Sequence, residues 1–152
     1  HFNKGMENLA SLDLITVLNE AVIIKKIPIL GICLGMQLMT SKSEEGNIEG
    51  LNWINAETKR FETDLKIPHV GWNTLTEIKN HSILKNLTEQ DQFYFVHSYN
   101  ITCKNKEDVL SYSCYGQEFV SSFQKENIFG TQFHPEKSHK QGLKIIKNFI
   151  NV

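Results

Sequence analysis

The first part of the chain alternates between helical and strand patterns of apolar residues. Between residues 14 and 25 apolar side chains recur every three to four positions, which predicts a helix with Asp13 as its N-cap. Pro28 ends it, the apolar run 29–32 fits a short buried strand, and good helix formers follow from Leu34. This order is typical of an α/β unit. The apolar face of the first helix would consist of Leu14, Val17, Leu18, Ala21 and Val22.

Beyond a polar loop over residues 41–50, the pattern changes to that of short strands. Helical signals are few from there to residue 133, apart from a turn near 82–87. Segments rich in β-branched and aromatic residues predict strands. These segments are 51–54, 58–61, 93–96, 109–112, 119–123 and 128–133.

The last segment, residues 141–151, has a helical pattern with Leu143, Ile146 and Ile150 on one face. No internal repeat, low-complexity tract or linker interrupts the chain. We therefore expect residues 1–152 to form one α/β domain, in which a strand-rich region extends a layered α/β unit and one more helix closes it.

Composition and charge narrow the possible functions. The 152 residues are 40% hydrophobic and 22% charged with a net charge of −1, which is ordinary for a globular protein and gives no sign of a general nucleic-acid or membrane binder. No apolar run approaches the roughly 20 residues of a membrane span. Cys33, Cys103 and Cys114 form neither a CxxC pair nor a metal-binding spacing. We expect reduced thiols in a cytoplasmic protein with no metal and no cofactor.

A tight turn carries the clearest chemical signal. Cys33 stands between Gly31 and Gly35 where the strand meets the helix, which is the pattern of a nucleophile elbow with a thiol in place of a hydroxyl. Side chains at either glycine would crowd the turn. The helix N-terminus should lower the thiol pKa, and the N–H of Leu34 should face a developing oxyanion. Alone, the pattern fits a nucleophile and a small buried cysteine about equally well.

A thiol nucleophile needs a general base, and His134 is the best placed of the six histidines. It follows an apolar strand, and sites in α/β folds form at strand ends. Pro135 keeps the chain extended, so His134 and Glu136 should point to the same side and the carboxylate can orient the imidazole. By itself His-Pro-Glu could be a surface loop, but combined with the elbow it predicts a Cys/His/Glu triad.

Two other histidines lie in apolar surroundings. The strand before His97 is so aromatic that it should belong to the core, while its end could offer backbone amides and a hydroxyl to a ligand carboxylate. His69 is interpreted as structural.

These motifs, in this order, resemble those of the class I (triad-type) glutamine amidotransferases. The matching stretches are GICLGMQLM, KRF, PHVGWN, FYFVHSY, YGQEF and GTQFHPEKS. Over essentially the whole chain they are similar to the glutaminase subunit of imidazole glycerol phosphate synthase. The resemblance implies a flavodoxin-like three-layer α/β/α fold with a mixed central sheet. It also implies strands and a glycine-rich oxyanion turn before residue 1, which this N-terminally truncated chain would lack.

The resemblance also implies roles for individual residues. Cys33 would be the nucleophile, His134 the acid and base, and Glu136 its orienting partner. Glu45 would suit the α-ammonium group of glutamine, and the backbone of residues 97–99 its α-carboxylate. The implied substrate-binding residues are Leu34, Gln37, Glu45, His97, Ser98 and Tyr99. The implied partner-interface and ammonia-passage residues are Trp72, Tyr94 and Lys137.

The implied reaction is hydrolysis of glutamine to glutamate and ammonia through a cysteine thioester. Ammonia would pass to a (β/α)8-barrel cyclase subunit in a heterodimer and serve histidine synthesis. The opening segment His1-Phe2-Asn3-Lys4-Gly5 departs from the small residues common there. A paralogue that supplies ammonia for sugar amidation in surface polysaccharide synthesis therefore stays open. An inactive subunit is a further alternative. Gln37 and the segment 96–99 favour glutamine over a protease or esterase substrate.

Overall fold

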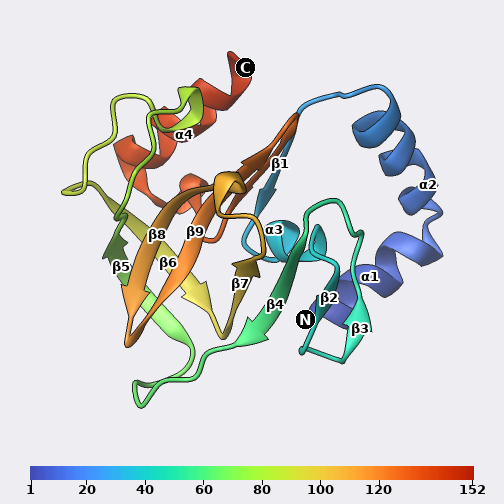
Figure 1. Cartoon of the computed structure of the whole chain (residues 1–152), viewed down its shortest axis with the longest axis horizontal. Helices are drawn as coiled ribbons and strands as arrows, with labels where there is room; N and C mark the ends of the chain where they lie inside the picture. The colour runs from blue at the N-terminus through green and yellow to red at the C-terminus, as the bar shows by residue number, and fades with distance from the viewer.

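In the computed structural model, which describes residues 1–152, a curled mixed β-sheet carries helices on both faces (Figure 1). The helices are α1 (Phe2–Ser11), α2 (Leu14–Asn19), α3 (Leu34–Leu38) and α4 (His139–Ile150), and α2 continues as a π-helical turn over Glu20–Ile24. Short 3₁₀ turns cover Ser82–Leu84, Lys106–Asp108 and Pro135–Lys137.

The strands form one large sheet and one two-stranded sheet. They are β1 (Ile29–Ile32), β2 (Lys42–Ser43), β3 (Ile48–Glu49), β4 (Ala56–Arg60), β5 (His69–Thr74), β6 (Gln92–His97), β7 (Tyr99–Cys103), β8 (Val109–Tyr115), β9 (Gln117–Lys125) and β10 (Ile128–Thr131). The large sheet has the order β1-β10-β9-β7-β4-β2-β3, with β8 also paired to β9, while β5 and β6 pair with each other. The β1–β10 and β2–β4 pairs are parallel and the others antiparallel, so the mixed sheet is confirmed.

Two apolar cores lie on opposite faces of the large sheet. Successive strand residues point to opposite faces, and in β10 Ile128 belongs to one core while Phe129 belongs to the other. Helix α3 contributes Met36 to the first core, and α4 contributes Ile145 to the second. Helix, sheet and helix therefore form three layers, as expected for the α/β/α fold.

Several predicted elements are confirmed and others are wrong. Strand β1 and the start of α3 agree with the sequence pattern, and β4, β6, β8, β9 and β10 overlap predicted strands. Residues 51–54 are not a strand, because Trp53 and Ile54 are buried by packing against the first core rather than by strand pairing. Helix α1 and strands β5 and β7 were not predicted.

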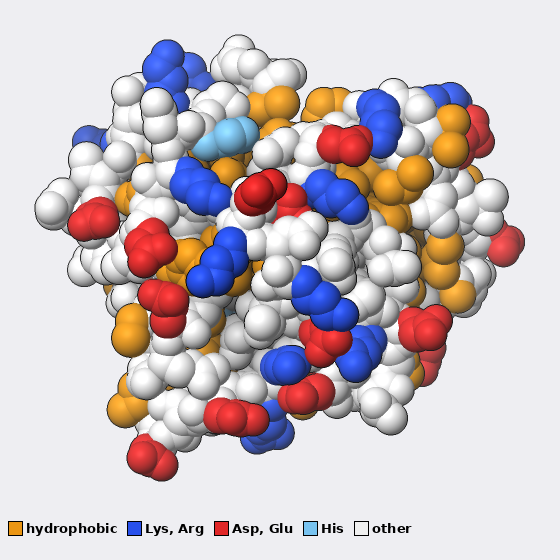
Figure 2. All heavy atoms as spheres, in the orientation of Figure 1, with side chains coloured by type: hydrophobic (Ala, Val, Ile, Leu, Met, Phe, Trp, Pro, Cys, Tyr) orange, Lys and Arg blue, Asp and Glu red, His pale blue; other side chains and the backbone are white.

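The predicted helix over residues 14–25 exists, but its packing differs from the prediction. Its apolar face is only partly buried: Val22 is buried and Leu18 packs against the first core, but Val17 is 59% exposed. Figure 2 shows apolar side chains gathered over α1 and α2, with charges of both signs mixed over the rest of that view. Asp13 occupies the N-cap position of α2, as predicted, but its backbone is left-handed and its side chain makes no capping bond.

Helix α4 also packs differently from the pattern. Leu143 and Ile150 are 63% and 75% exposed, whereas Gly142 and Ile145 are buried. The predicted face was therefore wrong by about one position: Gly142 lies against the backbone of Pro135, and the adjacent face with Ile145 and Phe149 packs inward. None of the helices combines the length and apolar character needed to cross a membrane.

Candidate active site

The turn between β1 and α3 holds Cys33 in a strained conformation. Its backbone has φ 49° and ψ −106°, a region that non-glycine residues rarely occupy and that concentrates at functional sites. The N–H of Cys33 donates to the carbonyl oxygen of Thr131 at 2.7 Å, which ties the turn to the end of β10. The carbonyl oxygen of Cys33 accepts from the N–H of Gln37 at 3.2 Å. The turn is thus fixed from both sides.

The two glycines of the elbow have different surroundings. A Cβ atom on Gly31 would lie 2.7 Å from the backbone carbon of Gly35 and the nitrogen of Met36, so a side chain is excluded there. A Cβ atom on Gly35 would meet nothing within 4 Å. The expected clash is therefore confirmed at Gly31 and wrong at Gly35, because the space beside Gly35 is open.

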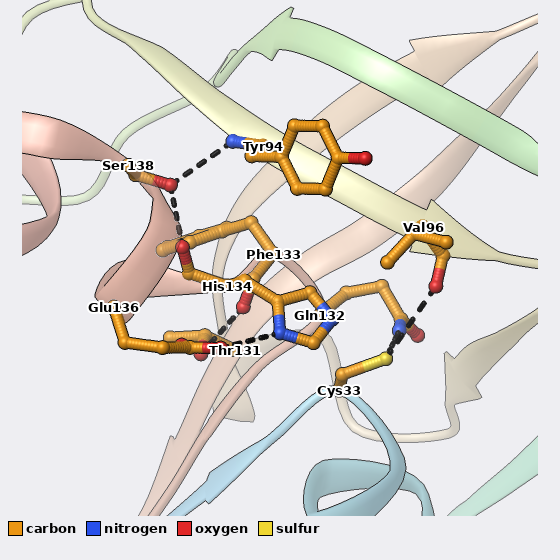
Figure 3. A network of polar contacts seen from close by, with 9 residues as sticks. All are labelled: Cys33, Tyr94, Val96, Thr131, Gln132, Phe133, His134, Glu136 and Ser138. Carbon is orange, nitrogen blue, oxygen red and sulfur yellow. Dashed lines mark hydrogen bonds and ion pairs between the residues drawn. The ribbon is translucent and has the colours of Figure 1, made fainter.

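The Cys33 sulfur lies among polar groups in a partly buried position. The side-chain amide of Gln132 is 3.6 Å from it, and the carbonyl oxygen of Val96 is 3.8 Å away (Figure 3). Burial raises the pKa of the thiol, and the N–H of Leu34 and the Gln132 amide oppose that rise only in part. The predicted net lowering of the thiol pKa is therefore wrong, and the resting group is a thiol that needs a base.

His134 has the geometry of such a base. Its Nδ1 lies 2.7 Å from the Glu136 carboxylate, which fixes the proton on Nδ1 and leaves Nε2 as an acceptor. Nε2 is buried and has no hydrogen-bond partner, and Figure 3 shows the ring pointing toward Cys33 and Gln132. A buried nitrogen left without a partner is costly unless a reacting group uses it.

A buried serine holds His134 to the neighbouring strand. The hydroxyl of Ser138 donates to the carbonyl oxygen of His134 at 2.6 Å and accepts from the N–H of Tyr94 at 3.0 Å. The N–H of His134 donates to the carbonyl oxygen of Tyr94 at 2.9 Å. These bonds anchor the backbone that carries His134 to β6, so the ring position depends on β6 as well as on its own loop.

A pocket of about 300 Å³ opens beside the sulfur. Its volume is at the lower end of the range for small-ligand sites. The structure brings the predicted nucleophile and every predicted substrate-binding residue to this pocket. The lining residues are His1, Cys33, Leu34, Gln37, Glu45, Pro68, Val96, His97, Ser98 and Tyr99.

The Glu45 carboxylate is already engaged in this structure. It accepts from the N–H of Phe2 at 2.7 Å and lies 2.8 Å from the His1 ring. Both contacts place a negative charge at the start of α1, which a helix N-terminus favours. Glu45 therefore lines the pocket while it also holds α1 against it.

The three predicted interface residues meet at a separate place. Trp72 and Tyr94 are opposite each other in the β5–β6 pair, with ring centroids 5.9 Å apart. The Lys137 ammonium lies 5.9 Å from the centroid of the Tyr94 ring. Trp72 is 45% exposed and stacks on His139, so this cluster reaches the surface. It is next to the triad in the chain, because Lys137 directly follows Glu136.

Sequence reasoning did not single out Gln132 or Ser138 as site residues. Both are fully buried, and both lie within the motif GTQFHPEKS, from which sequence reasoning assigned roles to His134, Glu136 and Lys137. For Gln132, the available signal was its place directly after an apolar strand and two positions before the candidate base His134.

Comparison with known proteins identifies the family. The family model described as glutamine amidotransferase class-I matches residues 5–152. The imidazole glycerol phosphate synthase subunit HisH 2 of Methanococcus maripaludis is 50% identical over 151 residues, which cover 98% of this chain and 75% of that protein. The protein of the same name from Pseudomonas aeruginosa is 46% identical over 153 residues, covering 99% and 76%.

A solved structure shares the fold. A glutamine amidotransferase from Thermotoga maritima has a TM-score of 0.61 at 18% identity, covering 95% of this chain and 56% of that one. The chain spans about three quarters of the length of the two relatives above. With the family model matched over nearly all of its residues, the chain belongs to the class I glutamine amidotransferases.

Proposed function

We propose that this chain is the glutaminase subunit of an imidazole glycerol phosphate synthase. It hydrolyses glutamine to glutamate and ammonia and supplies the ammonia to a cyclase subunit in histidine biosynthesis. The relatives that match nearly the whole chain are named as subunits of that enzyme. The observation that carries the proposal is the pocket in which Cys33 meets Gln37, Glu45 and the 97–99 segment.

The first half of the reaction follows from the positions around the sulfur. Glutamine lies with its α-ammonium group toward Glu45 and its side-chain amide at Cys33. Nε2 of His134 accepts the thiol proton as the sulfur attacks the amide carbon, and the Leu34 N–H donates to the oxyanion. His134 then gives the proton to the leaving nitrogen. Ammonia departs and a γ-glutamyl thioester remains on Cys33.

The second half uses the same base on water. His134 accepts a proton from a water molecule as the oxygen attacks the thioester carbon, and the thiol leaves with that proton. Glu136 stabilises the imidazolium in both halves because its carboxylate lies 2.7 Å from Nδ1. The products are glutamate, ammonia and free Cys33.

Ammonia then has to leave toward the partner without mixing with water. Trp72, Tyr94 and Lys137 form a cluster beside the triad that reaches the surface. We assign this cluster to the contact with a (β/α)8-barrel cyclase. In that subunit ammonia reacts with a phosphoribulosyl-formimino nucleotide to give imidazole glycerol phosphate and an aminoimidazole carboxamide ribotide.

Replacing the nucleophile separates the two activities. In the assembled complex, Cys33→Ala should abolish glutamine-dependent product formation and leave ammonia-dependent formation at the parental rate. Cys103→Ala is the matched control, because Cys103 is also a partly buried free thiol but lies in β7 away from the pocket. Loss of both activities in Cys33→Ala would contradict a channelled ammonia intermediate.

The acceptor is tested with the partner. Glutamine hydrolysis by the complete protein should rise strongly when the barrel cyclase and its nucleotide are added. If the rate of hydrolysis does not change with this cyclase but rises with a barrel partner that amidates a sugar, the chain belongs to polysaccharide synthesis. Absence of hydrolysis in every combination would assign it as an inactive subunit.

A further inference from the structure

A pair of buried histidines lies directly behind the 97–99 segment of the pocket. His69 in β5 and His97 in β6 are opposite each other in the β5–β6 pair, and their Nδ1 and Nε2 atoms are 3.0 Å apart. The His69 ring is sandwiched between Phe95 and Tyr115, at centroid distances of 5.0 and 4.1 Å. No carboxylate contacts either ring, and burial lowers the pKa of both histidines, so both rings are neutral at neutral pH.

The direction of every hydrogen bond in this pair is determined. Nδ1 of His97 lies 2.8 Å from the carbonyl oxygen of Tyr99, which can only accept, so His97 carries its proton on Nδ1. Nε2 of His97 is then an acceptor, and Nδ1 of His69 must donate to it. Nε2 of His69 accepts in turn from the amide of Asn73 at 3.5 Å. With both rings neutral, each of the four ring nitrogens of His69 and His97 has a hydrogen-bond partner.

The chain of bonds continues from Tyr99 to the nucleophile. The carbonyl oxygen of Tyr99 also accepts from the side-chain amide of Gln37 at 3.0 Å. The same amide nitrogen donates to the side-chain oxygen of Gln132 at 3.0 Å, and the Gln132 nitrogen donates to the Cys33 sulfur. Gln37 and Gln132 are both buried. A continuous series of hydrogen bonds therefore joins Asn73 on β5 to the sulfur. The Tyr99 carbonyl oxygen accepts from both sides, so it is the point at which the donor-to-acceptor direction reverses.

Strand β5 has a second face that is open to a partner. His69 and Asn73 lie on one face of β5, while Val70 and Trp72 alternate with them and are exposed. Gly71 has φ 140°, and a Cβ atom there would meet nothing within 4 Å. A partner that contacts the outer face of β5 would therefore contact the strand that carries His69 and Asn73, the first two residues of the hydrogen-bond series.

We propose that His69 and His97 form a neutral hydrogen-bond relay through which β5 positions the Gln37 and Gln132 amides around the Cys33 sulfur. They are positioning residues, because neither ring touches the sulfur. The proposal rests on the proposed function only in taking Cys33 as the reactive thiol. The relay makes the state of the nucleophile depend on β5, whose outer face includes Trp72.

The test measures the reactivity of Cys33 without using glutamine. Alkylation of the Cys33 peptide by iodoacetamide is followed by mass spectrometry across pH, which distinguishes Cys33 from the other two thiols. His69→Phe fills the aromatic sandwich but removes the donor. It should slow alkylation below the thiol pKa by roughly fivefold, the value of one hydrogen bond of about 1 kcal/mol, and shift the pH profile upward.

Two further variants separate the relay from simple packing. His69→Asn places an amide nitrogen where Nδ1 lies and should restore the parental profile to within about twofold, although it packs less well than Phe. His81→Phe is the matched control, since His81 is a partly buried histidine outside the network. It should leave the alkylation profile unchanged.

A double-mutant cycle decides whether the effect travels through Gln132. In a Gln132→Met background the sulfur has lost its donor, so adding His69→Phe should change the alkylation rate by less than about twofold. An undiminished fivefold effect in that background, or equal slowing by His69→Phe and His69→Asn, would overturn the relay. If the relay holds and glutamine is not hydrolysed, the proposed function fails separately.

Discussion

The side-chain amide of Gln132 donates a hydrogen bond to the sulfur of Cys33, although the two residues are 99 positions apart in the chain. The contact exists because β1 and β10 are parallel neighbours with Ile32 opposite Thr131, so the residues that follow both strands emerge side by side. This one pairing brings the GICLG turn next to the QFHPE segment. Strand order, rather than either motif alone, builds the site.

Replacing Gln132 should therefore impair the nucleophile directly. Gln132→Met keeps the side-chain volume and removes the donor, and hydrogen bonds to charged groups are worth about 1.5–3 kcal/mol. We expect the turnover number for glutamine to fall by about 10- to 100-fold, with a smaller change in KM. Steady-state kinetics of the complex measure both. Gln124→Met in β9 is the control, and a parental turnover number in Gln132→Met would remove Gln132 from the mechanism.

The elbow glycines should respond differently to the same substitution. Gly31→Ala places a Cβ atom 2.7 Å from backbone atoms that cannot move without breaking the turn, and we expect a loss of about 3 kcal/mol or more in the free energy of unfolding. Gly35→Ala fills open space in a helix, where alanine is preferred by about 1 kcal/mol.

Urea unfolding of the two variants provides the comparison. Gly35→Ala should be at least as stable as the parent, and Gly31→Ala far less stable. Similar destabilisation by both would mean that the space beside Gly35 is filled in the working protein.

The sequence predicted the candidate catalytic residues better than the buried residues that hold them in place. Cys33, His134 and Glu136 were identifiable because nucleophile, base and carboxylate occur in short local patterns. Gln132 and Ser138 act through bonds to distant strands, and no local pattern distinguishes a buried glutamine that serves a thiol from one that is merely packed. The raised thiol pKa was missed for the same reason, since burial of Cys33 depends on residues far along the chain.

The fold shows a similar division. Strands β6, β9 and β10 were predicted because each contains a cluster of apolar and aromatic residues. All four residues of β10 are buried, whereas burial in β6 alternates along the strand. Strand β5 was missed because its sequence, HVGWNT, alternates exposed apolar with inward polar residues, the reverse of the usual pattern. Its inward His69 and Asn73 are polar because they form a hydrogen-bonded series rather than an apolar core.

The carboxylate of Glu136 should matter less than the imidazole it orients. Glu136→Gln retains a hydrogen-bond acceptor near Nδ1 but removes the charge that stabilises the imidazolium. We expect the turnover number for glutamine to fall substantially and still exceed that of His134→Ala, as for orienting residues in other triads. A turnover number equal to the parent's would exclude Glu136 from the triad.

The buried histidine pair should make stability depend on pH. Burial lowers the pKa of His69 to about 4 and that of His97 to about 3, below the value of about 6.5 expected in the unfolded chain. Between those values the unfolded state binds more protons than the folded state, so the free energy of unfolding falls as pH falls from about 6.5 to 4. Each ring contributes a slope of up to about 1.4 kcal/mol per pH unit.

Urea unfolding at pH 7, 6, 5 and 4.5 measures this slope. In His69→Phe the slope should be smaller by the contribution of one ring, while His139→Phe, at an exposed position, should leave it unchanged. An identical slope in His69→Phe and the parent would show that folding does not lower the pKa of His69.

The most direct test of the central claim is to identify the covalent intermediate. The complex is mixed with glutamine in the presence of the cyclase ligand and quenched in acid, and its peptides are analysed by mass spectrometry. The account predicts a γ-glutamyl group on the peptide that contains Cys33, and no such group in Cys33→Ala. Ammonia release without any adduct on Cys33, or with the adduct on Cys103 or Cys114, would contradict it.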